Sequence, residues 1–127
     1  MFVILISLRA NSCKDNGGVT PDYVRVKGML IGKEYCHSDT TKDYWLIALN
    51  PTENMIQYGD SLQLNDTIYA HVVKTLQLPE DVKVKGTKMI FDFKIISTDK
   101  IITPSCDIQT PVTYPLKEVT LLSVSHY

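Results

Sequence analysis

The sequence contains few of the features that identify a function directly. Its 127 residues include no apolar run near the roughly 20 residues of a membrane-spanning helix, so we expect none. Basic residues are not in excess, because 13 Lys and Arg stand against 14 Asp and Glu, and a net charge of −1 gives no electrostatic basis for binding nucleic acid. There is no fixed-period repeat and no glycine-rich phosphate loop. A hydrophobic content of 44% is nevertheless enough for the core of one domain.

Patterns typical of catalytic or metal sites are equally scarce. His37, Ser38 and Asp39 place three triad residue types side by side, but working triads draw their members from separate parts of a chain. A turn explains these residues better. Cys36 is followed by a histidine, yet no C-x-x-C or H-x-x-x-H spacing occurs. The sequence therefore predicts no catalytic residue, no metal and no cofactor, and we expect a protein that is not an enzyme.

The N-terminus carries the strongest pattern. An apolar run at 2–8 is followed by small or polar residues and then by Cys13. This order resembles the end of a bacterial lipoprotein signal peptide, which is cleaved before a cysteine that is then acylated. The resemblance implies a partial signal peptide at 1–12 and lipidation at Cys13. A basic region usually precedes the apolar run of a signal peptide, and a start codon upstream of Met1 would account for its absence before residue 2. The alternative is that 2–8 form an ordinary first strand and that Cys13 is a thiol.

Residues 13–22 are expected to form a flexible tether, because they are polar and contain Gly17, Gly18 and Pro21. A lipid-anchored protein needs such a spacer between the membrane and its folded domain. We therefore expect an outer-membrane lipoprotein of the cell envelope, facing the periplasm or the cell exterior, with the membrane as a partner through its lipid anchor.

The two remaining cysteines support export. Cys36 and Cys106 form an even pair, and an even pair in an exported chain favours one disulfide. Two unrelated reduced thiols in a cytosolic protein are the alternative.

Strand patterns fill most of the chain from residue 23 onward, whereas only 78–82 is a candidate for a short helical turn. Residues 97–115 contain three prolines and are expected to form a long loop. Asn65-Asp66 is a two-residue hairpin signal. The expected strands are 23–33, 43–49, 61–64, 67–73, 88–96 and 117–124.

Alternation assigns side chains to faces in two of these strands. In 88–96, the residues expected to face the core are Met89, Phe91, Phe93 and Ile95. In the first strand, Val24 and Val26 are expected to share one face. A glycine at position 28 suggests a bulge or a bend there.

These elements predict an all-β domain at 23–127, a small five- to six-stranded OB-like barrel with at most one short helical turn. A small β-sandwich is the alternative, because strand count alone does not separate the two. An OB barrel would place Cys36, in the loop after the first strand, beside Cys106, in the connection before the last strand. Their α-carbons should then lie within about 7 Å.

The domain contains, in order, the motifs Val26-Lys27-Gly28, Cys36, Asp43-Tyr44-Trp45-Leu46-Ile47, Tyr58-Gly59-Asp60, Tyr69, Val72-Val73, Lys85-Gly86-Thr87-Lys88, Phe91-Asp92-Phe93, Cys106 and Pro111-Val112-Thr113-Tyr114. This series resembles small envelope lipoproteins of Bacteroidota, whose domain is OB-like. The resemblance covers most of 13–124. It implies lipidation at Cys13 but brings no activity, cofactor or catalytic residue.

Aromatic and basic residues gather where an OB domain binds its ligands, on the second and third strands and the loops that frame them. Aromatic rings beside cations stack on bases or on sugar rings. The alternative is that these aromatics belong to the core. We expect a protein, a glycan or a small molecule as ligand, and a cytosolic OB-fold binder of single-stranded nucleic acid is the second hypothesis. The candidate ligand-face residues are Tyr35, Tyr44, Trp45, Lys33 and Lys42.

Overall fold

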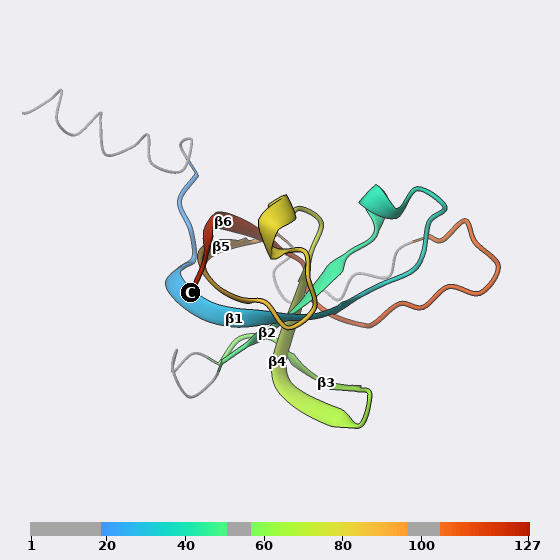
Figure 1. Ribbon diagram of the computed structural model, residues 1–127, viewed down its shortest axis with the longest axis horizontal. Coiled ribbons are helices and arrows are strands. Elements are labelled where there is room, and N and C mark those ends of the chain that lie inside the picture. Colours follow the sequence, from blue (N-terminus) through green and yellow to red (C-terminus); the bar gives the residue numbers. More distant parts are fainter. Residues whose placement is uncertain (1–18, 51–56, 97–104) are drawn as a thin grey trace, which may run out of the picture.

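The structure is a computed structural model that describes residues 19–50, 57–96 and 105–127 (Figure 1). The expected signal peptide at 1–12, the lipidation site Cys13 and most of the tether lie outside these residues. The predicted all-β class is confirmed, since the described residues form one six-stranded antiparallel sheet. The strands are β1 (Tyr23–Lys33), β2 (Trp45–Leu49), β3 (Asp60–Leu64), β4 (Thr67–Thr75), β5 (Lys88–Ile95) and β6 (Val119–His126).

The only helical elements within the described part of the chain are two single 3-10 turns. The expected turn is present as η2 (Glu80–Val82), and a second, η1 (Thr40–Lys42), lies between β1 and β2. The expectation of at most one turn was therefore wrong. Asp39 explains the extra turn, because its carboxylate accepts a hydrogen bond from the Thr41 N–H at 3.1 Å and caps the turn. No helix in these ranges is long and apolar enough to cross a membrane.

The sheet curls into a barrel-like form. Its order is β3-β4-β2-β1-β5-β6, so β4 and β6 lie far apart along the sheet. They are nevertheless joined where β6 begins, since Lys74 and Glu118 form a parallel bridge and the Lys74 N–H donates to the Lys117 carbonyl at 3.0 Å. Strands β1, β2, β4, β6 and β5 thus make a ring, and the β3–β4 hairpin extends from one side of it (Figure 1). The finer resemblance to OB domains stays a prediction.

The core lies on both faces of the central strands. Inside the ring, Met89, Phe91 and Phe93 of β5 are buried, and Ile95 is partly buried against the same cluster, which confirms the faces predicted for this strand. A second cluster fills the space between the sheet and the β3–β4 hairpin. Double-sided burial explains why β2 is an unbroken apolar run rather than an alternating one. The buried members of the second cluster are Ile31, Leu46, Ala48, Val72 and Leu116.

Strand β1 departs from simple alternation. Val26 is 2% exposed but Val24 is 61% exposed, so the expectation that they share a face was wrong. The cause is Arg25, which has a φ of 51° and sits where the pairing with β5 shifts register. Its N–H donates to the Asp92 carboxylate at 2.8 Å, which holds this backbone in place.

Gly28 is not a bulge, because it pairs in register with both β2 and β5. It allows close packing instead. A Cβ at this position would lie 3.1 Å from the Ala48 carbonyl oxygen and 3.2 Å from the Phe91 ring. The hairpin signal, in contrast, is confirmed: Asn65 and Asp66 join β3 to β4 with φ values of 51° and 67°, as a tight turn with both central residues left-handed requires.

Candidate functional site

One end of the barrel is tied together by a disulfide. Cys36, in the loop after β1, is bonded to Cys106, in the connection before β6, and their α-carbons are 4.6 Å apart. The predicted bridge is thus confirmed. Backbone hydrogen bonds accompany it: the Asp107 N–H donates to the Cys36 carbonyl at 2.9 Å, and Tyr35 and Val112 exchange bonds of 2.9 and 2.7 Å. Two segments distant in sequence therefore form one rim.

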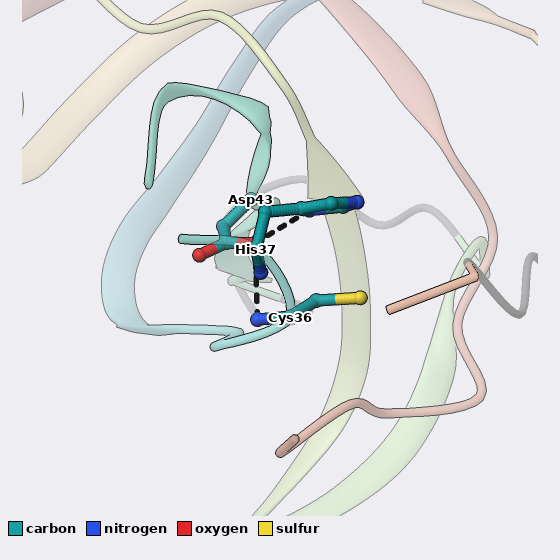
Figure 2. Close-up of side chains that lie close together, drawn as sticks. All are labelled: Cys36, His37 and Asp43. Carbon is teal, nitrogen blue, oxygen red and sulfur yellow. Dashed lines mark hydrogen bonds and ion pairs between the residues drawn. The ribbon is translucent and has the colours of Figure 1, made fainter. Parts of the chain in front are cut away.

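The loop around Cys36 is folded about a buried carboxylate (Figure 2). Asp43 is 1% exposed, and its Oδ1 accepts the backbone N–H groups of Cys36 and His37, each at 3.0 Å. The Nδ1 of His37 lies 2.9 Å from the same oxygen. His37, Ser38 and Asp39 stand side by side in the sequence and were interpreted as a turn. Asp39 bonds Thr41, whose hydroxyl and N–H lower the pKa of the Asp39 carboxyl.

A buried ion pair joins this rim to β4. The Lys74 ammonium lies 2.9 Å from Glu34 Oε2, and both side chains are fully buried. Backbone groups of Tyr114 complete the arrangement, since its N–H donates to Glu34 at 2.8 Å and its carbonyl accepts from Lys74 at 3.1 Å. The pair therefore connects the end of β1, β4 and the segment leading into β6.

The Tyr44 side chain bonds protein groups of the same region and is therefore not available to a ligand. Its hydroxyl donates to the Glu118 carboxylate at 3.0 Å, and the Lys74 ammonium lies 4.7 Å from the centre of its ring. Burial, together with the negative charge and hydrogen bond of Glu118, raises the pKa of Tyr44 to about 12. The hydroxyl is therefore neutral at physiological pH and holds β2 to the start of β6.

A cleft beside Trp45 is the candidate ligand site. Its volume is about 630 Å³, within the usual range for small-molecule sites. Two ammonium groups flank the indole, Lys33 Nζ at 4.7 Å and Lys83 Nζ at 5.7 Å from the ring centre. The other lining residues come from η1 and from the segment between β4 and η2: Thr40, Thr41, Leu76, Gln77 and Leu78.

The predicted ligand face is divided by the structure. Lys33 and Trp45 line the cleft together, whereas Tyr44 turns to Glu118. Tyr35, 55% exposed, lies on the disulfide rim, and Lys42 is exposed on η1 without lining the cleft.

Sequence reasoning missed Lys83. Its position just after η2 gave the only signal, and the ring closure that brings η2 across to Trp45 is not visible in the sequence. Comparison of the chain with protein-family models, with curated proteins and with solved structures finds no match. The function is therefore inferred from the residues described above.

Proposed function

We propose that this chain is a lipoprotein of the bacterial envelope, anchored through Cys13, whose barrel binds an anionic glycan in the Trp45 cleft and catalyses no reaction. Two observations support the location. The Cys36–Cys106 disulfide is of the kind that persists in oxidising compartments. The apolar run before Cys13 and the polar segment after it fit a lipidated N-terminus.

The ligand class is inferred from the indole of Trp45, which lies beside the ammonium groups of Lys33 and Lys83. An aromatic face suits the apolar side of a sugar ring, and ammonium groups beside it suit carboxylate or sulfate substituents. The threonine hydroxyls of η1 add hydrogen-bonding groups. None of the described residues that line the cleft is acidic, and the carboxylate of Glu80, outside the lining, is paired with Lys83.

The same lining supports a binding role rather than catalysis. The cleft residues include no histidine, cysteine, aspartate or glutamate within the described chain, so no imidazole, thiol or carboxylate of the lining faces a bound ligand. Lys33 and Lys83 hold their positions by donating to the Thr40 carbonyl at 2.8 Å and pairing with Glu80 at 2.6 Å. They act as fixed positive charges.

Single-stranded nucleic acid is the second candidate, because an indole beside lysines also suits stacked bases and phosphates. The balanced overall charge and the disulfide weigh against it.

The test is calorimetric titration of the full chain with three probes of similar length: a polyuronate oligosaccharide, a neutral oligosaccharide and a single-stranded oligonucleotide. We expect binding of the polyuronate and weakening of about tenfold in Lys83→Ala, as loss of one charge-assisted hydrogen bond of ~1.5 kcal/mol implies. Lys85→Ala is the matched control, since Lys85 is exposed in the same connection but does not line the cleft. Absence of polyuronate binding would refute the glycan assignment. Preferential, steeply salt-dependent binding of the oligonucleotide would establish the second candidate instead.

A further inference from the structure

The disulfide rim contains a group of metal-ligating side chains that the proposed function does not use. The sulfur of Cys36, a ring nitrogen of His37 and a carboxylate oxygen of Asp43 all lie within 4.8 Å of one another. The Cys106 sulfur joins them, since it is bonded to the Cys36 sulfur at 2.00 Å. None of these residues lines the Trp45 cleft.

We infer that reduction of the Cys36–Cys106 disulfide opens a zinc site whose protein ligands are the two cysteine thiolates and the imidazole of His37. Cysteine sulfur and histidine nitrogen are the preferred ligands of Zn²⁺, and two cysteines with one histidine leave a fourth position for water. While the bridge is intact, neither sulfur is a thiolate, so the oxidised protein holds no such site.

The structure already fixes the histidine for this role. Asp43 is a carboxylate and accepts hydrogen bonds, so the 2.9 Å contact makes Nδ1 the protonated ring nitrogen and leaves Nε2 for a metal. A carboxylate behind a ligating histidine is the usual outer partner in zinc sites. Asp43 is itself held by the N–H groups of Cys36 and His37. Figure 2 shows the His37 ring and the Cys36 sulfur extending to the same side, away from the Asp43 carboxylate.

The distances require little movement. Zinc bonds of about 2.0 Å to nitrogen and 2.3 Å to sulfur place tetrahedral ligands within roughly 4 Å of one another. The Cys36 sulfur and a ring nitrogen of His37 lie within 4.8 Å of each other, and the two cysteine α-carbons are only 4.6 Å apart. After reduction, the two sulfurs must move apart by side-chain rotation. This rotation is the main adjustment that zinc binding requires.

A dithiol reductant breaks the S–S bond and is itself oxidised to a disulfide, while two electrons and two protons pass to Cys36 and Cys106. Zinc then binds both sulfurs as thiolates, and their two protons are released to solvent.

The experiment uses the full chain carrying Cys13→Ala, which removes the third thiol. Oxidised and dithiol-reduced protein, freed of excess reductant, are titrated with Zn²⁺ against a chromophoric chelator, and with Co²⁺ to detect sulfur-to-metal charge-transfer absorption. We expect one equivalent bound by the reduced protein, charge-transfer absorption with cobalt, and no binding by the oxidised protein.

Variants test the ligand set. His37→Gln removes a partly exposed ligand and should lower zinc affinity at least ~10-fold, and Asp43→Asn should lower it about 10- to 100-fold through His37. His126→Gln, an exposed histidine paired with Asp81, is the control and should bind as the parent does. The double variant Cys36→Ser/Cys106→Ser lacks the bridge and both thiols, so it should bind no zinc. The site is refuted if reduced and oxidised protein bind zinc equally or not at all, or if His37→Gln retains the parent affinity.

Discussion

The buried Lys74–Glu34 pair gives the sharpest test of how the barrel is closed. Both side chains are fully buried, and their charges lie 2.9 Å apart. Removing one charge breaks a buried ion pair, which typically costs about 3–5 kcal/mol of stability. We therefore expect Lys74→Met and Glu34→Gln each to lower the free energy of unfolding by about that amount.

The double variant separates the charge effect from simple loss of contacts. With Glu34→Gln and Lys74→Met together, neither position carries a charge and the Gln amide oxygen still accepts the Tyr114 N–H. The Tyr114 carbonyl loses its lysine donor, at a cost of about 1–3 kcal/mol. The double variant should thus be no less stable than either single variant, which is a strongly non-additive result.

The assay is urea or guanidinium unfolding of the oxidised proteins, with comparison restricted to variants of equal m-value. Lys94→Met is the control, because Lys94 forms an exposed pair with Asp22 at 3.6 Å and should cost less than about 1 kcal/mol. Single variants of Lys74 and Glu34 that cost no more than this control, or that add without coupling, would refute the account of the closure.

The Cys36→Ser/Cys106→Ser variant should lose about 4 kcal/mol of unfolding free energy, because the bridge closes a loop with a sequence separation of 70. An unchanged denaturation midpoint would contradict this loss of stability. The pKa of Tyr44 is raised to about 12 from an ordinary 10, so the unfolded chain loses this proton at lower pH than the folded chain does. The free energy of unfolding should therefore fall as pH rises from about 10 toward 12. Tyr44→Phe should remove that part of the pH dependence, as measured by tyrosinate absorbance and by unfolding at each pH. Expressed from its full gene, the protein should partition into detergent, and Cys13→Ala should release it from the membrane; a variant that fractionates like the parent would exclude the anchor.

Much of the fold is present in local sequence patterns. The strands follow from β-branched and aromatic alternation, and the hairpin at Asn65-Asp66 from its turn residues. The disulfide follows from placing two cysteines in loops that a barrel brings to one end. These features depend on neighbours in the chain or on the general layout of a barrel.

The missed features depend on contacts between distant residues. The fourth strand was expected to end at Val73, yet Lys74 and Thr75 belong to β4 and are buried. Lys74 is stabilised there by Glu34, 40 positions away, which lies against it. Asp43 and Lys83 were missed for the same reason: each owes its role to a loop closure that no local pattern records.

The most direct test of the proposed function uses the fluorescence of Trp45, the single tryptophan of the chain, as a reporter inside the cleft. Titration with a polyuronate oligosaccharide should change the emission in a saturable way, with the midpoint shifted to higher ligand concentration in Lys83→Ala and unchanged in Lys85→Ala. An emission that does not respond, or a midpoint that is the same in parent and Lys83→Ala, would contradict binding of an anionic glycan at this site.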